Sequence, residues 1–263
     1  MNVVILQHDI LWDQPEANRQ RLERQIDAHP GADLYVLSEM WDTGFATQPL
    51  QRNETQAEAS LRWMADMARR HQAALAGSLA TGDRGQGDNV WRNRFCFVTP
   101  DGRCQHYDKR HLFTYAGEHL HYTPGHERVV VEWQGWRLLL AVCYDLRFPV
   151  WTRNTPAHPY DAILYVANWP ASRIEAWSTL LRARAIENQA YVLGVNRVGD
   201  DPQCHYCGAS AIIDPRGRTL AQCPPDEEST AQATLDRDAL MAFRAKFPVL
   251  RDADDIKEIN NTI

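Results

Sequence analysis

Short apolar runs, each of four to seven residues, recur along the whole chain of 263 residues. The runs are rich in Val, Ile, Leu and Ala, and they are bounded by polar or turn-forming residues, so they predict β-strands. The predicted strands span residues 3–6, 34–37, 73–79, 95–98, 129–133, 138–143, 163–167, 191–196 and 209–213.

Helical patterns lie between some of these strands, and tight turns join others. The predicted helices span residues 16–28, 54–70 behind Asn53, 174–188 behind Ser172, and about 238–246. The turn sequences are TPDGR, WQGW and DPRGR, which suit antiparallel connections. Because both kinds of connection occur, the sequence predicts an α/β fold in which two mixed sheets form a sandwich with helices outside.

A single domain spanning residues 1–263 is expected, because 44% of the residues are hydrophobic and a chain of this length can bury one sizeable core. No internal repeat, low-complexity tract or Pro/Gly/Ser-rich linker marks a boundary within it. Residues from about 248 to 263 include the segment RDADDIKEIN and are expected to form a tail that is solvated or binds a partner.

The charge pattern and the cysteine content exclude several classes of protein. The net charge of −6 comes from dispersed Asp and Glu, so no basic stripe favours nucleic acid or acidic lipid. The sequence has no signal peptide pattern and no apolar stretch of about 18 residues, which predicts a cytoplasmic protein without a membrane segment. Its six cysteines are too sparse for a disulfide scaffold and are expected to be free thiols.

Three reactive side chains occur where predicted strands end. Cys143 follows the run LLLAV, Glu39 ends LYVLSE, and Lys109 follows the segment HYD, where a further predicted strand gives way to a loop. Taken alone, the cysteine is more often a small buried hydrophobe, and the Glu and Lys are more often solvated charges. Taken together, they supply a nucleophile, a base and a cation at positions where the ligands of α/β sheets usually bind.

These three groups are what acyl transfer from an amide requires. A carboxylate beside the thiol can remove its proton, return it to the leaving ammonia and then activate water against the thioester. The ammonium of Lys109 and the backbone N–H of Tyr144 would stabilise the oxyanion. This chemistry needs no cofactor and no metal.

The segments SEMWDTGF, YDKRHLF and AVCYDLRFP resemble, in this order, the three signature segments of the nitrilase, or carbon–nitrogen hydrolase, superfamily. The resemblance implies a four-layer αββα sandwich and a catalytic triad of Glu39, Lys109 and Cys143. In many members a second active-site Glu precedes a Pro-Gly between the Lys and Cys segments. The segment GEHLHYTPG places Glu118 there, with an implied role in orienting the substrate amide and holding the Lys.

Within the superfamily, the segments KRHLF, GEHLHY and ANWP are most similar to those of the bacterial ω-amidases, or 2-oxoglutaramate amidases. The resemblance implies hydrolysis of the terminal amide of 2-oxoglutaramate or 2-oxosuccinamate. Such amides remain when glutamine or asparagine donates its amino group, so the implied role is nitrogen recycling. A homodimer is expected, with a tetramer as the alternative, because family members commonly pair near the active site.

The anionic end of such a substrate needs a cationic or hydrogen-bonding partner in the pocket. Arg173, which follows ANWPAS, is the first candidate for the carboxylate clamp. Arg147 is expected instead to form a buried ion pair that stabilises the turn after Cys143. Arg110 is expected to point away from Lys109. The expected apolar walls are Trp169, Phe113 and Tyr144.

Other functions remain open at this point. Cys204 and Cys207 form a CxxC pair that could bind zinc, although a single pair without a second one is weak evidence for a metal site. The same triad could serve an aliphatic amidase, a carbamoylase or a nitrilase, because a fold does not fix a substrate. The segment CYD in place of the usual CWE argues against a nitrilase, and retention of all four reactive residues argues against a noncatalytic binding protein.

Overall fold

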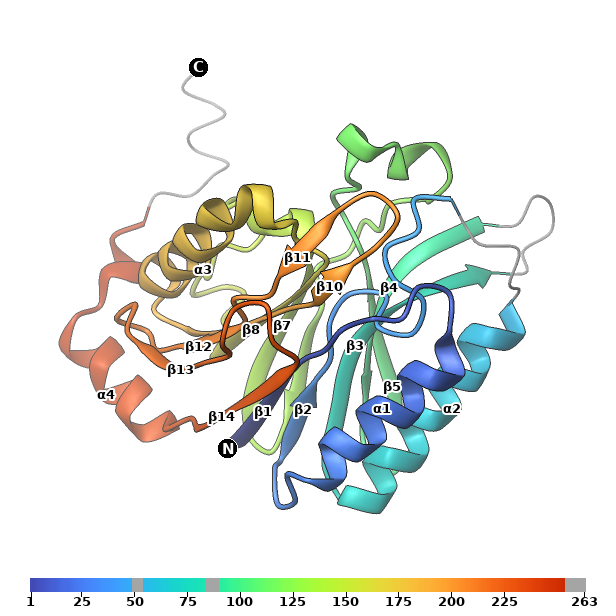
Figure 1. The fold of residues 1–263 in the computed structure, drawn as a ribbon. Helices are drawn as coiled ribbons and strands as arrows, with labels where there is room; N and C mark the ends of the chain where they lie inside the picture. Colours follow the sequence, from blue (N-terminus) through green and yellow to red (C-terminus); the bar gives the residue numbers. More distant parts are fainter. Residues whose placement is uncertain (49–53, 84–89, 254–263) are drawn as a thin grey trace.

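The computed structural model describes residues 1–48, 54–83 and 90–253. In this part of the chain, two six-stranded mixed sheets face each other (Figure 1). The first sheet has the order β14 (Ser229–Thr234), β1 (Asn2–Gln7), β2 (Leu34–Val36), β3 (Ala74–Asp83), β4 (Val90–Val98) and β5 (Cys104–Asp108). The second has the order β13 (Thr219–Gln222), β12 (Ala211–Ile213), β9 (Tyr191–Asn196), β8 (Ala162–Ala167), β7 (Trp136–Val142) and β6 (Val130–Trp133).

Helices cover the outer faces of both sheets (Figure 1). Helices α1 (Pro15–Asp27) and α2 (Glu54–His71) pack on the first sheet, and α3 (Ile174–Asn188) packs on the second. Helix α4 (Arg237–Lys246) lies at the edge of the sandwich, and β10 (Val198–Asp200) and β11 (His205–Cys207) form a separate hairpin. The predicted α/β sandwich with outer helices is confirmed.

Both faces of the central strands are buried, which explains why their sequences are continuously apolar. In β7, Leu138, Leu140 and Val142 pack between the two sheets. The alternate residues Leu139 and Ala141 pack against the α3 layer. This alternation produces three stacked apolar layers, two beneath helices and one between the sheets.

The strand directions bring several carboxyl ends to the same edges. Strands β1, β2 and β3 are parallel to one another, as are β7, β8 and β9. Strand β5 pairs antiparallel with β4, which pairs antiparallel with β3, so β5 ends at the same edge as β2. Carboxyl ends of parallel strands are where side chains for ligand binding collect.

Some predicted boundaries are wrong. Ser172 is not the N-cap of α3, because residues Ala171–Arg173 form a 3₁₀ turn before the helix and no side chain caps it. Asp236 caps α4 by accepting a hydrogen bond from the backbone N–H of Ala239 at 2.9 Å. The predicted cap Asn53 and the segment 254–263 of the predicted tail lie outside the described residues.

No helix in the described ranges is both long and apolar enough to cross a membrane.

Candidate active site

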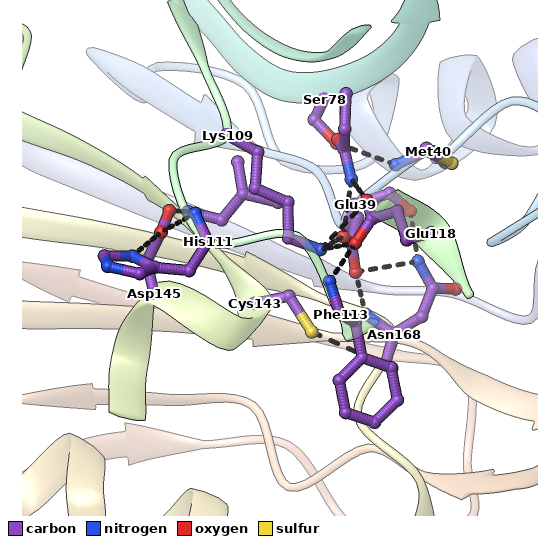
Figure 2. A network of polar contacts seen from close by, with 12 residues as sticks. Glu39, Met40, Ser78, Lys109, His111, Phe113, Glu118, Cys143, Asp145 and Asn168 are labelled. Atoms are coloured by element: carbon purple, nitrogen blue, oxygen red, sulfur yellow. Dashed lines mark hydrogen bonds and ion pairs between the residues drawn. The ribbon is translucent and has the colours of Figure 1, made fainter. Parts of the chain in front are cut away.

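Three strand ends converge between the two sheets. Glu39 lies shortly after β2, Lys109 directly after β5, and Cys143 directly after β7. Figure 2 shows the side chains of these residues directed toward one another, together with Glu118. The structure thus brings together all four residues that the sequence predicts for the catalytic site.

Lys109 lies between two carboxylates in the interior. Its Nζ is 2.9 Å from Glu39 Oε1 and 2.9 Å from Glu118 Oε2, and all three side chains are fully buried. Burial by itself lowers the pKa of Lys109, but the negative charges of Glu118 and Glu39 outweigh it and raise the pKa above its ordinary value. Lys109 therefore carries a positive charge throughout the physiological pH range.

Backbone and amide donors fix the carboxylate of Glu39. Its Oε1 accepts a hydrogen bond from Asn93 Nδ2 at 2.7 Å, and its Oε2 accepts one from the backbone N–H of Asn168 at 2.8 Å. Asn93 in turn accepts a hydrogen bond from Ser78 Oγ at 2.9 Å. Asn93, Asn168 and Ser78 were not identified from sequence, because the sequence prediction rested on a nucleophile, a base and a cation at strand ends, and none of these three residues fits that pattern.

Glu118 lies in a 3₁₀ turn, Glu118–Leu120, of the loop that follows Lys109. Its Oε2 accepts a hydrogen bond from the backbone N–H of Phe113 at 2.6 Å. Burial raises the pKa of Glu118, and the charge of Glu39 raises it further, while Lys109 opposes both effects. This geometry makes Glu118 a partner that orients the Lys109 ammonium.

Cys143 has a backbone conformation that only a few non-glycine residues adopt. Its φ is +45°, and it begins the 3₁₀ turn Cys143–Arg147. This conformation turns the chain sharply out of β7, and Cys143 as a whole residue is partly exposed. Burial and the negative charge of the adjacent Glu39 raise the pKa of Cys143 well above its ordinary value, and the thiol lies 4.0 Å from the carbonyl oxygen of Asn168.

A pocket opens over the thiol. The four residues predicted to contact substrate, Phe113, Tyr144, Trp169 and Arg173, all line it together with Cys143. The guanidinium of Arg173 lies 5.5 Å from the centre of the Phe113 ring. Arg173 forms no side-chain hydrogen bond or ion pair with the residues that the structure describes.

The expectation that Arg147 belongs to a buried ion pair is wrong. Arg147 is exposed, lines the same pocket, and lies 4.9 Å from the centre of the Trp169 ring. The buried charged position of this turn is occupied by Asp145, whose carboxylate contacts His111. Two guanidiniums, rather than one, therefore face the pocket.

Arg110 points away from Lys109, as expected. Its guanidinium donates a hydrogen bond to the carbonyl of Gly125 at 3.2 Å and lies 5.6 Å from the centre of the Trp151 ring. Arg110 therefore contributes no charge to the pocket over Cys143.

The β10–β11 hairpin provides another wall of the pocket, which sequence reasoning did not predict. Asp201, Gln203, Cys204 and Tyr206 line the pocket from this side.

Cys204 and Cys207 are both free thiols. Within the described residues, no group of three His, Cys, Asp or Glu side chains is arranged to hold a metal ion. Cys204 thus lies in the wall of the pocket that opens over Cys143.

The sequence model of carbon–nitrogen hydrolases matches residues 2–245. The chain belongs to this family. The Cys143 thiol, the Glu39 carboxylate and the Lys109 ammonium therefore lie together in a member of an enzyme family that cleaves carbon–nitrogen bonds.

Curated relatives cover nearly the whole chain. The protein "Omega-amidase YafV" of Escherichia coli K12 is 45% identical, and the match covers 98% of each chain. The protein "2-oxoglutaramate amidase" of Bacillus subtilis is 32% identical over 96% of each chain. Among solved structures, the carbon–nitrogen hydrolase superfamily protein XC1258 of Xanthomonas campestris has a TM-score of 0.91 and 40% identity. That match covers 97% of this chain and 98% of XC1258, whose active site carries an arsenic adduct.

Proposed function

We propose that the protein is an ω-amidase, which hydrolyses the terminal amide of 2-oxo dicarboxylic acid monoamides such as 2-oxoglutaramate and 2-oxosuccinamate. The observation that carries the proposal is the position of Cys143, beside Glu39 and Lys109 and beneath a pocket that two arginines line. Relatives named as an omega-amidase and a 2-oxoglutaramate amidase, which match nearly the whole chain, support it.

The resting thiol is neutral, because its pKa is raised, so the reaction begins with proton removal. Glu39 is the carboxylate beside the thiol and accepts its proton as Cys143 Sγ bonds to the amide carbon. The π electrons of the carbonyl move to its oxygen and form an oxyanion. Lys109 and the backbone N–H of Tyr144 are the donors that stabilise this negative charge.

Collapse of the tetrahedral intermediate breaks the carbon–nitrogen bond. Glu39 gives its proton to the leaving nitrogen, which departs as ammonia, and a thioester remains on Cys143. Glu39 then takes a proton from water, the hydroxide attacks the thioester, and the thiolate departs and regains the proton. One fixed carboxylate thus serves both half-reactions.

The arginines account for the preference for an anionic acyl group. Arg147 and Arg173 each present a guanidinium that lies over an aromatic ring, and aromatic stacking leaves the N–H groups at its edge available. A carboxylate can accept two parallel hydrogen bonds from such an edge. We assign Arg173 as the primary clamp for the substrate carboxylate and Arg147 as a second donor to the 2-oxo acid end.

A neutral aliphatic amide or a nitrile would leave both guanidiniums without an anionic partner. The same catalytic residues could act on either compound, so the pocket rather than the triad distinguishes these alternatives.

The decisive experiment compares ammonia release from 2-oxoglutaramate, glutamine, glutaramate, a neutral aliphatic amide and a simple nitrile. We expect rapid release from 2-oxoglutaramate, and no release by Cys143→Ala. Cys207→Ala is the matched control, because it removes another partly buried free thiol that does not line the pocket and should retain turnover. Equal rates with the keto amide and a neutral amide would contradict the substrate assignment, and full activity of Cys143→Ala would contradict the mechanism.

A further inference from the structure

We infer that Asp145 is a positioning residue that joins the Lys109 segment to the Cys143 turn, so that the ammonium and the thiol keep their relative positions. The inference rests on the proposed acyl transfer by Cys143. It assigns a role in the reaction to a carboxylate that does not itself contact the substrate.

The Asp145 side chain is fully buried and accepts hydrogen bonds on both oxygens. Oδ1 lies 3.0 Å from the backbone nitrogen of His111 and 2.8 Å from His111 Nδ1. Oδ2 lies 2.8 Å from the hydroxyl of Tyr107 and 2.9 Å from the backbone nitrogen of Val142. A carboxylate has about four acceptor sites, so these four donors use its whole capacity.

The donors come from the two segments that carry the reacting groups. Tyr107 and His111 lie two residues before and two residues after Lys109, and Val142 directly precedes Cys143. Figure 2 shows His111 and Asp145 in contact on the side of Lys109 opposite to the two glutamates. One carboxylate therefore links the end of β5 to the end of β7, across the two sheets.

Surrounding contacts restrain the donors in turn. The His111 ring stacks on Phe148 with 3.8 Å between ring centres and an interplanar angle of 8°. The Tyr107 hydroxyl accepts hydrogen bonds from Trp151 Nε1 at 3.0 Å and from the backbone N–H of Arg110 at 3.0 Å. The network is thus fixed from both ends, and Asp145 is its shared acceptor.

The linkage also supports the strained conformation of Cys143. A left-handed backbone at a residue with a side chain persists only where neighbouring contacts hold it. The hydrogen bond from Val142 to Asp145 lies directly before the strained residue and closes the turn. Loss of this bond lets Cys143 relax, which displaces the thiol and also the Tyr144 N–H that faces the oxyanion.

The first test is Asp145→Asn, which preserves size but replaces one acceptor oxygen with a donor. Its NH₂ group must face N–H donors of His111 or Val142, so one link is lost. We expect kcat for 2-oxoglutaramate to fall about 10- to 100-fold, because small misplacements of reacting groups carry large rate penalties. KM should change less than about threefold, because no contact with the substrate carboxylate is removed.

Tyr107→Phe tests the linkage from the Lys109 side and remains informative if Asp145→Asn does not fold. It removes the hydrogen bond to Asp145, and the two that the hydroxyl accepts from Trp151 and Arg110, without substituting a residue of the Cys143 turn, so we expect kcat to fall about 3- to 10-fold. The double variant should be no slower than Asp145→Asn, because both changes break the same connection. A contribution to stability alone would leave kcat unchanged below the melting temperature.

Alkylation by iodoacetamide, followed at the Cys143 peptide by mass spectrometry, separates this inference from the proposed substrate. We expect both variants to change the alkylation rate of Cys143 and leave that of Cys204 unchanged, even if no amide is turned over. Failure of the wild type on every amide would reject only the proposed function.

Asp161→Asn is the control, because Asp161 is another buried carboxylate but pairs with Arg137 and Arg244 away from the thiol. It should lower the melting temperature and leave kcat within about twofold, as expected when no contact near the reacting groups is changed. The inference is overturned if folded Asp145→Asn retains wild-type kcat and Cys143 alkylation. It is also overturned if the effects of Asp145→Asn and Tyr107→Phe on kcat multiply.

Discussion

Arg147 and Arg173 have similar surroundings, because each guanidinium lies over an aromatic ring at the same pocket. Hydrogen bonds to a charged group contribute about 1.5–3 kcal/mol, so Arg173→Met should raise KM for 2-oxoglutaramate about 10- to 100-fold. Turnover at saturation should change little, because the clamp binds ground state and transition state alike. Steady-state kinetics check this prediction.

Arg216→Met is the matched control for the arginine prediction. The Arg216 guanidinium also lies over an aromatic ring, 4.1 Å from the centre of Phe243, but it does not line the pocket. Its loss should leave KM unchanged. If Arg147→Met raises KM while Arg173→Met does not, the primary clamp is Arg147.

Glu118 offers a second prediction at the residue scale. Glu118→Gln keeps the shape but removes one of the two negative charges beside Lys109 and can place an NH₂ group against its ammonium. We expect kcat to fall about 100-fold, as for the loss of a preorganised group in an oxyanion site. Glu175→Gln, an exposed change in the first turn of α3, should have no effect on kcat. Wild-type turnover of Glu118→Gln would show that Glu39 alone orients the ammonium.

Sequence reasoning at this scale located reactive groups better than their partners. Glu39, Lys109 and Cys143 each follow a strand, so a polar residue at the end of an apolar run marked them. Asn93 lies inside a strand, and Asp145 lies in a turn, where Asp is common. The sequence around these two residues therefore did not indicate that they belong to a buried hydrogen-bond network. The environment of Arg147 depends on the path of a 3₁₀ turn, which residue order alone does not specify.

At the scale of elements, helix α3 approaches β9 so closely that Gly194 has no space for a side chain. A Cβ at this position would lie 2.4 Å from Leu181 Cδ1. Gly194→Ala therefore overpacks the interface and should lower the free energy of unfolding by about 1–3 kcal/mol. Urea denaturation measures the change.

A second substitution checks that the clash with Leu181 is the cause. Leu181→Ala alone should destabilise by leaving a cavity, but the added methyl group of Gly194→Ala then occupies space that the cavity leaves. The double variant should be less destabilised than the sum of the single variants. Additive losses would assign the effect of Gly194→Ala to another contact.

Elements buried on both faces were the most predictable. The sequence pattern identified β7, β8 and β9, whose residues are almost all apolar. Strand β14 has the sequence STAQAT and lies at a sheet edge, and was missed, because it lacks an apolar run. The β10–β11 hairpin was missed for the same reason, although it lines the pocket.

At the scale of the whole molecule, the mixed connections were sufficient to predict two sheets with helices outside. The pairing of the sheets was harder to predict, because each apolar run can face either a helix layer or the opposite sheet. The core between the sheets contains residues far apart in sequence, such as Ile5 and Leu140. Successive residues of a strand point to opposite faces of the sheet, and the pairing of the strands decides which face lies against the other sheet and which lies against the helices.

Two buried groups make the stability of the whole molecule depend on pH in opposite directions. Burial lowers the pKa of His8 to about 4, and burial raises the pKa of Asp42 to about 6. Unfolding restores ordinary values of 6.5 and 3.8. Below pH 6.5 the unfolded chain binds the His8 proton more readily, so that contribution to stability is lost as pH falls from 6.5 through 4. Asp42 contributes stability that is lost as pH rises from 3.8 through 6.

These two effects partly offset each other in the wild type, so single variants are needed to separate them. Between pH 7.5 and pH 5, the free energy of unfolding of the wild type should fall by about 2 kcal/mol relative to His8→Gln. When the pH is lowered over the same interval, the free energy of unfolding of the wild type should rise by about 1 kcal/mol relative to that of Asp42→Asn. Urea unfolding at the two pH values measures both differences. Parallel pH profiles for the wild type and His8→Gln would mean that the pKa of His8 is the same in the folded and the unfolded protein, and would contradict its lowering by burial.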